Sequence, residues 1–374
     1  MLRPEQSETL ATPPNHPQPE VSVYHTGVRA VARNDTPTRR RLLTVGAALV
    51  AGSVAGCSAT DPTATGTETA TTTPTESTTA GEPTTTSTET ATPTGGTVET
   101  LVSVPGERVP ENMAFDAEGD LYFGITAGEV RRLDADRTNE TGLTLDDTEL
   151  VATLPGAIGV ETGPDGTIYV AVPGGDDGPG VWAVPSDGEP SRLVGIDGFP
   201  NDLTFDAERD RLLVTESQGG VVYAVGTDGS RTTWLDDDRL DTESFGANGI
   251  ASDAVGNVYV AVTRAANETG RLLRVPVADD GSAGEATTFF DGGELFGADG
   301  ITVRGGDVYV AANSQNRVVR VASDGETTVV ADAEDGLVFP SDVLFGPGEM
   351  DDSLFVCNFA NQSPDDGAIL RMRV

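Results

Sequence analysis

Four oxygen-bearing side chains occupy the same position in successive copies of a repeated unit. They are Glu111, Asn201, Asn248 and Asp299, and the corresponding residues of the two other copies are Ile158 and Ser341. Carboxylate and amide oxygens are the ligands that hard divalent cations such as Ca²⁺ prefer. If the copies form a closed ring, these side chains converge on its axis, and the sequence predicts a divalent-cation site there.

Histidine chemistry is excluded from this region, because both histidines, His16 and His25, precede the first repeat. The repeats therefore contain no Ser-His-Asp or Cys-His pair, no histidine ligand for zinc and no histidine general base. Carboxylate and amide groups remain as the candidates for binding and catalysis.

Each copy of the repeat reads as short β-strands separated by turns. The clearest strand is the second, in which β-branched or aromatic residues follow a turn rich in Gly or Asp. These second strands begin at Asp120, Thr167, Arg211, Asn257, Asp307 and Ser353. The marked positions 111, 158, 201, 248, 299 and 341 are 42 to 51 residues apart, a period typical of a four-stranded propeller blade. We therefore predict an all-β fold, a six-bladed β-propeller spanning residues 98–374.

The ends of the repeat region indicate how the ring closes. The sixth copy stops after its third strand at Val374, and the segment Val98–Val104 has the pattern of a fourth strand with no other place in the repeat. We expect this N-terminal strand of the domain to complete the last blade, which removes exposed strand edges. An open solenoid or a five-bladed ring with a decorated end is the alternative.

Propeller geometry predicts which residues share a face with the site. The first strand of a blade starts near the axis, and the loops joining second to third strands lie on the same face. These loops contain many Asn, Asp and Arg residues, which suits a polar ligand. They span residues 172–180, 216–220, 264–270, 313–316 and 358–366.

The repeats resemble the family of six-bladed propellers that includes senescence marker protein, gluconolactonase and luciferin-regenerating enzyme. The resemblance covers residues 98–374. It rests on four short motifs: Glu111 four residues before Phe115, Pro200-Asn201-Asp202, Ala247-Asn248-Gly249 and Ala298-Asp299-Gly300. The resemblance implies that Glu111, Asn248 and Asp299 bind a divalent metal, with Ca²⁺ favoured. It also implies that Asn201 lies near the substrate and completes a Glu-Asn-Asn-Asp set like that of calcium-dependent phosphotriesterases and lactonases.

The sequence departs from the family pattern in two respects. Phe199 stands where sugar lactonases of the family often have an Arg, and the histidine dyad of animal lactonases is absent. Asp202 follows Asn201 directly, and we expect it to orient Asn201 or a coordinated water.

The function expected from this site is metal-dependent hydrolysis of a lactone or related ester. The metal would polarise a carbonyl or phosphoryl oxygen. Asp299 is the candidate general base or nucleophile, and Glu111 would balance the metal's charge. A non-catalytic cell-surface binding propeller with a structural calcium ion is the alternative function. A quinone-dependent sugar dehydrogenase is disfavoured, because such enzymes use a histidine base.

The charge of the chain limits its partners and setting. It carries 60 acidic and 23 basic residues, a net charge of −37, and every basic residue is an arginine. So acidic a surface argues against nucleic-acid binding, since phosphates would be repelled. It is typical of a protein hydrated in strong brine, and we expect a halophilic archaeal source.

The N-terminal region reads as an export signal and a tether. Residues 1–57 form a leader, in which Arg39-Arg40 belongs to a twin-arginine-like motif and Cys57 ends a lipobox-like sequence. Residues 58–97 are a Thr-rich linker, predicted to be disordered. We expect an exported protein at the cell surface, anchored to the membrane by a lipid on Cys57. The only other cysteine, Cys357, is predicted to be a buried small hydrophobe.

Overall fold

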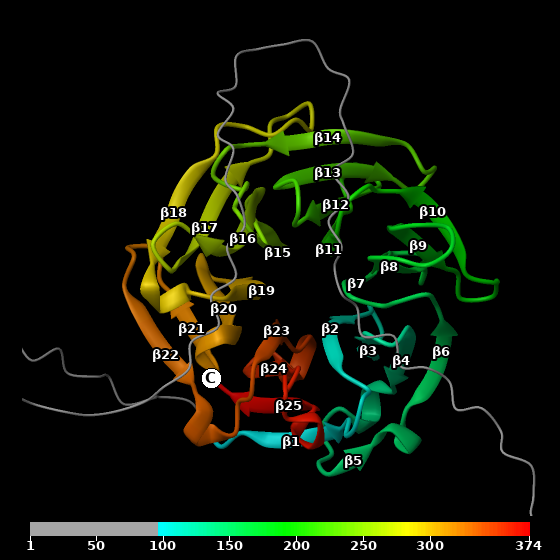
Figure 1. The fold of residues 1–374 in the computed structure, drawn as a ribbon. Helices are drawn as coiled ribbons and strands as arrows, with labels where there is room; N and C mark the ends of the chain where they lie inside the picture. Colours follow the sequence, from blue (N-terminus) through cyan, green and yellow to red (C-terminus); the bar gives the residue numbers. More distant parts are fainter. Residues whose placement is uncertain (1–95) are drawn as a thin grey trace, which may run out of the picture. The chain divides into compact units, whose positions relative to one another are not determined.

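The computed structural model describes residues 96–374, which form six antiparallel sheets arranged around a central axis (Figure 1). Blades 1 to 3 consist of β2 (Pro110–Phe115), β3 (Leu121–Ile125), β4 (Glu129–Leu133) and β6 (Glu149–Thr153); β7 (Val160–Thr162), β8 (Ile168–Val172), β9 (Gly180–Val184) and β10 (Ser191–Gly195); and β11 (Pro200–Asp206), β12 (Arg211–Glu216), β13 (Val221–Gly226) and β14 (Arg231–Asp236). Blades 4 and 5 consist of β15 (Ala247–Ser252), β16 (Asn257–Ala265), β17 (Thr269–Pro276) and β18 (Thr287–Gly292); and β19 (Ala298–Arg304), β20 (Asp307–Ala312), β21 (Arg317–Val321) and β22 (Thr327–Ala331). The predicted six-bladed β-propeller is confirmed.

The sixth blade combines the two ends of the domain. It contains β23 (Pro340–Phe345), β24 (Ser353–Asn358), β25 (Ala368–Arg373) and β1 (Glu99–Ser103). Strand β1 lies beside β25 (Figure 1) and pairs antiparallel with it, with Glu99 opposite Arg371 and Ser103 opposite Ala368. The predicted closure by the N-terminal strand is therefore confirmed. An additional short strand, β5 (Leu143–Thr144), pairs parallel with the outer side of β1 and was not expected.

The blades pack through the apolar side chains of their middle strands. All five residues of β3 and of β8 are buried, and so are all six of β24, because both faces of each strand lie against neighbouring blades. The turns before them need special backbone geometry: Gly166 has φ +78° in the turn where Gly163 N–H donates to Thr167 O over 2.8 Å. Apolar residues between blades thus supply most of the stabilising buried area.

At the start of the innermost strands, the pairing with the second strand of the blade is irregular, and this is where the site residues lie. In blades 1, 3, 4 and 5 the pairing of the first strand with the second shifts register over its first residues, for example between Pro200 and Leu203. The residues within the shift make no regular ladder pairs. Their side chains can therefore point to the axis instead of alternating across the sheet.

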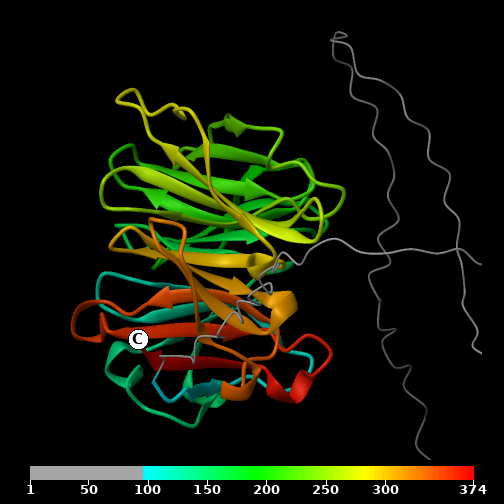
Figure 2. The ribbon, with the colours of Figure 1, turned by 90° about the vertical axis from the view of Figure 1, so that its left-hand side faces the viewer.

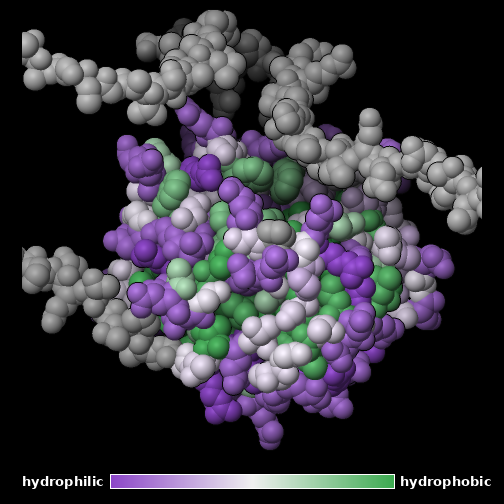
Figure 3. Space-filling model, turned by 60° about the horizontal axis from the view of Figure 1, so that its bottom comes forward, coloured by the Kyte–Doolittle hydropathy of each residue, from purple (hydrophilic) through white to green (hydrophobic). Residues whose placement is uncertain are grey.

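Loops gather at the two faces of the ring, as the side view shows (Figure 2). Short 3-10 helices occur in some of them, such as Gly293–Leu295 and Asn313–Gln315. The outer surface seen in Figure 3 carries mostly hydrophilic residues. Cys357 is free and fully buried, in agreement with its prediction.

The N-terminal predictions lie outside the described residues. The leader with Arg39-Arg40 and Cys57, and residues 58–95 of the linker, are not described. Within residues 96–374, none of the helices has the length and apolar character that crossing a membrane would require.

Candidate functional site

The predicted site residues occupy equivalent places in the ring. Glu111, Asn201, Asn248 and Asp299 are each the second residue of an innermost strand, β2, β11, β15 and β19 respectively. Figure 1 shows these strands nearest the axis. Asn201, Asn248 and Asp299 are 5 to 7% exposed. Ser341 has the same place in β23, whereas Ile158 lies just before β7.

Direct interactions connect these residues between blades. The amide of Asn248 in blade 4 hydrogen-bonds the carboxylate of Asp299 in blade 5. Ser341 Oγ in blade 6 donates to the backbone oxygen of Glu111 in blade 1 over 2.6 Å. Glu111 and Asp299 are close enough for the charge of Asp299 to raise the pKa of Glu111. Asn248 and Asp299 therefore interact directly, and the charge of Asp299 reaches Glu111, as do the charges of Asp202 and Asp342.

Three further residues, not identified from the sequence, hold the site side chains in place. Asn201 Nδ2 donates to Ser217 Oγ over 2.9 Å, and Asn248 Nδ2 donates to Thr263 Oγ1 over 2.9 Å. Asn313 Nδ2 donates to Asp299 Oδ2 over 2.7 Å. Each partner follows its site residue by 14 to 16 positions, at the end of the second strand of the same blade. No sequence signal singles them out, because the offset varies and hydroxyl or amide residues near a strand end have many other roles.

These hydrogen bonds also orient the two amides. Because the amide nitrogen of Asn201 faces Ser217 and that of Asn248 faces Thr263 and Asp299, the carbonyl oxygen of each amide remains available to a ligand. An amide oxygen held in this way is a suitable ligand for a hard cation.

The axis accumulates negative charge. Burial raises the pKa of Glu111 well above its usual value, and the nearby carboxylates of Asp299, Asp202 and Asp342 raise it further. Burial likewise raises the pKa of Asp299 to about 7, although hydrogen bonds from Asn313 and Asn248 oppose the shift. Burial and the charge of Asp202 raise the pKa of Asp342 well above its usual value. No arginine is among the groups that set these pKa values, so protons or a cation must balance the charge.

The residues present fit a divalent cation bound by mixed ligands. Glu111 and Asp299 would supply two carboxylates, and Asn201 and Asn248 would supply two amide oxygens, which matches the oxygen ligands and charge that Ca²⁺ prefers. Among residues 96–374, no three or more Asp, Glu, His and Cys side chains form a group that could hold a metal. A site at this axis therefore depends on the amides as well as the carboxylates.

A second ring of residues lies one position further along the innermost strands. In blades 1, 3 and 6 it consists of Asn112, Asp202 and Asp342, whose side chains accept hydrogen bonds from the backbone of the next blade. Val160 N–H donates to Asn112, Ile250 N–H to Asp202, and Met113 N–H to Asp342, over 2.9 to 3.0 Å. These bonds tie blade 1 to 2, blade 3 to 4, and blade 6 to 1.

Glycine takes this position in the remaining blades, at residues 159, 249 and 300. A Cβ on Gly249 would lie 2.2 Å from the backbone oxygen of Asp299, and one on Gly300 would lie 2.2 Å from Asp342 Oδ1. The inner strands of neighbouring blades thus approach too closely for any side chain at these three places.

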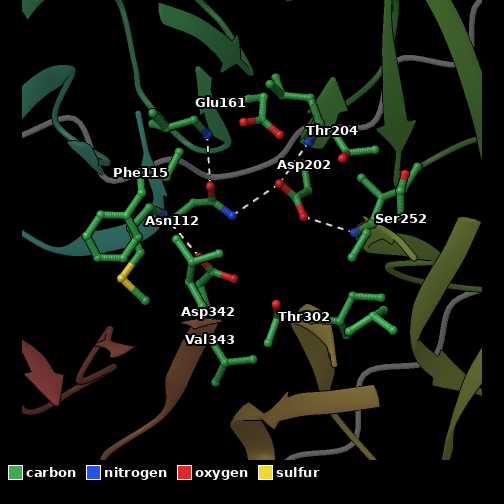
Figure 4. A pocket seen from close by; sticks show the side chains of 18 of the residues that line it. Asn112, Phe115, Glu161, Asp202, Thr204, Ser252, Thr302, Asp342 and Val343 are labelled. Atoms are coloured by element: carbon green, nitrogen blue, oxygen red, sulfur yellow. Dashed lines mark hydrogen bonds between the residues drawn. The ribbon is translucent and has the colours of Figure 1, made fainter. Parts of the chain in front are cut away.

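Asp202 was expected to orient Asn201 or a coordinated water, and its hydrogen bonds go to groups other than Asn201. Asp202 accepts from Asn112 Nδ2 over 3.1 Å and from the backbone N–H groups of Leu203 and Ile250 (Figure 4). The bond that orients the Asn201 amide comes from Ser217 instead. Asp202 therefore joins three blades, and these contacts keep the rise in its pKa, caused by burial, to about 6.

An axial cavity of about 250 Å³ lies beyond this second ring (Figure 4). Asn112, Asp202 and Asp342 line it together with Glu161, whose pKa burial raises to about 7. Glu111, Asn201, Asn248 and Asp299 are not among its lining residues. The cavity belongs to the opposite half of the axis from the predicted site.

Comparison with known proteins agrees with this architecture. The family model for the N-terminal part of strictosidine synthase-like proteins matches residues 99–133, which include Glu111. No curated protein sequence matches the chain. A gluconolactonase from Xanthomonas campestris is similar in structure, with a TM-score of 0.55 and 17% identity over 74% of this chain and 88% of that one. A luciferin-regenerating enzyme has a TM-score of 0.56 and 16% identity over 75% of this chain and 96% of its own.

The chain shares the six-bladed propeller fold of these enzymes. The same fold occurs in a PQQ-bound aldose sugar dehydrogenase from Streptomyces coelicolor, with a TM-score of 0.54 and 16% identity over 76% of this chain and 99% of that one. Because one propeller fold serves different chemistries, function must be argued from the site of this propeller.

Proposed function

We propose that this propeller is a divalent-metal-dependent hydrolase that acts on a lactone or related ester. The observation that supports the proposal best is the hydrogen bond between the buried Asp299 carboxylate and the amide of Asn248, with Glu111 within reach of the charge of Asp299. Asn201 has the same place in the innermost strand of the blade next to that of Asn248. The fold of a gluconolactonase agrees with it.

A divalent cation held by these four side chains would polarise the carbonyl oxygen of the ester and stabilise the negative charge that develops there. Glu111 would balance the charge of the cation. Asn313 and Asn248 hold the carboxylate of Asp299 by hydrogen bonds, so its orientation is fixed before the substrate arrives. Asp299 would take the proton of the attacking water as general base, or attack the carbonyl carbon itself.

Hydrolysis of lactones by the full-length chain in concentrated KCl tests the proposal. Turnover should require Ca²⁺ or another divalent cation, disappear on addition of a chelator, and return when the metal is restored. Asp253→Asn is a matched control, because Asp253 binds Val255 N–H and Asn257 N–H in a turn away from the axis. Metal binding that raises the melting temperature without turnover of any ester would favour a non-catalytic binding propeller with a structural calcium ion.

We also propose that the protein is exported and anchored at the cell surface by a lipid on Cys57, on the sequence pattern alone. The membrane fraction of the source or a related halophilic host should contain the wild-type chain. Cys57→Ser should move it to the soluble exported fraction, and an unchanged distribution would contradict the anchor.

A further inference from the structure

A phenylalanine lies shortly before the site position in four consecutive blades. Phe199 precedes Asn201, Phe245 precedes Asn248, Phe296 precedes Asp299 and Phe339 precedes Ser341, each by two or three residues. The loops that carry them lead into the innermost strands, so these loops lie on the face of the propeller where the strands with Asn201, Asn248 and Asp299 begin.

Two of the rings form one apolar surface across blades 3 and 4. Phe199 and Phe245 contact edge to face, with ring centroids 5.2 Å apart and an interplanar angle of 85°. Phe245 is 40% exposed, which is rare for a large apolar residue among those the structure describes. The backbone of Phe199 is fixed on both sides: its N–H donates to Glu216 Oε1 over 2.8 Å, and its oxygen accepts from Ser217 N–H over 2.9 Å. Ser217 is also the residue that holds the amide of Asn201.

The ring of Phe296 contacts the residue that follows Thr263, the hydrogen-bond partner of Asn248. The guanidinium of Arg264 lies over the ring of Phe296, 5.7 Å from its centroid. Arg264 directly follows Thr263, to which Asn248 donates. Gly297 N–H donates to Thr263 O over 3.0 Å, which fixes the loop of Phe296 beside the site.

The fourth ring is held in an unfavourable backbone conformation. Phe339 has φ +50°, in the left-handed region that a bulky residue rarely adopts. Its N–H donates to Asn316 Oδ1 over 2.8 Å, and its ring contacts Phe359 with centroids 5.8 Å apart. Such strain is retained where the surroundings impose it, commonly at functional sites.

We propose that the ester or lactone taken by this site carries an apolar, ring-bearing group that packs against Phe199, Phe245 and Phe296, and that polyhydroxylated sugar lactones are poor ligands. This inference rests on the proposed function. The phenyl rings offer no hydrogen bonds to the hydroxyl groups of a sugar lactone, so these hydroxyls gain nothing from contact with the rings. A phenyl-substituted lactone instead gains buried apolar area and edge-to-face ring contacts.

The experiment compares a phenyl-substituted δ-lactone with glucono-δ-lactone, using the full-length chain with Ca²⁺. The same pair of ring systems is also tested as non-hydrolysable lactams by calorimetry. The phenyl compound should be preferred in both measurements. Phe245→Ala should lower kcat/KM and lactam affinity for the phenyl compound by about tenfold, with little effect on unsubstituted δ-valerolactone. Leu150→Ala is the control, because Leu150 is a comparably exposed apolar residue on the outer strand β6.

The outcomes separate this inference from the proposed function. If the sugar lactone is hydrolysed faster than the phenyl lactone and Phe245→Ala leaves both rates unchanged, the inference would be overturned and the hydrolase proposal would remain intact. Binding of the phenyl lactam that Phe245→Ala weakens, with no turnover of any ester, would support the inference and overturn the hydrolase proposal. Equal binding of both lactams would overturn the inference whatever the turnover.

Discussion

Asn313 Nδ2 donates a hydrogen bond of 2.7 Å to Asp299 Oδ2, and both side chains are buried. A donor of this kind favours the charged form of a carboxyl group, so it opposes the burial that raises the pKa of Asp299.

Asn313→Ala should therefore raise the pKa of Asp299 further. If Asp299 acts as a deprotonated base, the acidic limb of the pH–rate profile should move to higher pH by about one unit. Measurement of kcat/KM from pH 5 to 9 at a fixed, subsaturating Ca²⁺ concentration checks this, because a bound cation would keep Asp299 deprotonated. Asn313→Asp, which removes the donor and adds a charge, should shift the limb in the same direction. An unmoved limb in both variants would show that Asp299 is not the titrating group.

Asp299→Asn should abolish ester hydrolysis while the propeller remains folded. Loss of a general base costs about 10² to 10⁴ in rate, and loss of a metal ligand adds to that. Turnover should therefore fall by at least about a thousandfold, measured beside a thermal unfolding curve. The substitution removes a buried carboxylate and keeps the shape, so the melting temperature should not fall. Unchanged turnover would remove Asp299 from the mechanism.

The chelated protein should lose stability as the pH rises from about 4 to about 7. Folded Glu111, Asp299 and Asp342 retain protons in this window because their pKa values are raised, whereas the unfolded chain has released them. A state that binds more protons is favoured at low pH, so the free energy of unfolding decreases through the window. Melting temperatures at fixed KCl should show the decline, and Ca²⁺ should reverse it above pH 7. A flat curve in chelator would contradict the raised pKa values.

Gly249→Ala should destabilise the ring near its axis. The added Cβ would meet the backbone oxygen of Asp299 at 2.2 Å, and backbone atoms there cannot rotate away. The expected loss is about 1–3 kcal/mol of unfolding free energy, measured by denaturant titration. Gly293→Ala is the control, because a Cβ at Gly293 would have no neighbour within 4 Å. Equal stability of the two variants would show that the inner strands adjust freely.

The fold was largely predictable because each blade repeats the same local signals. Strand sequences such as Val308-Tyr309-Val310, after a turn rich in Gly or Asp, mark the second strand of each blade. The segment before the first repeat, which had no other place in the pattern, indicated how the ring closes. Strand β5 was not predictable, because Leu143 and Thr144 pair only through the neighbouring β1. Two residues carry no periodicity of their own.

The candidate site was predictable only in its repeated positions. Glu111, Asn201, Asn248 and Asp299 share a place in the repeat, so their common location followed from the ring. Ser217 and Thr263 could not be singled out, because a hydroxyl residue near a strand end has many other roles. Asp342 follows Ser341, and a serine at the site position gives no indication of a carboxylate ring at the next position. Its importance depends on the contact with Met113 in the next blade.

The pairing of Glu99 with Arg371 joins segments that are 272 residues apart. Strand β1 is made before the other strands of the propeller and its partner β25 after them, so the ring cannot close until β25 has been made. Until then the unpaired edges of the incomplete ring can pair with strands of other chains. A circular permutant that links Val374 directly to Gly96 would make this pairing local, and stopped-flow refolding should be faster if ring completion limits the rate.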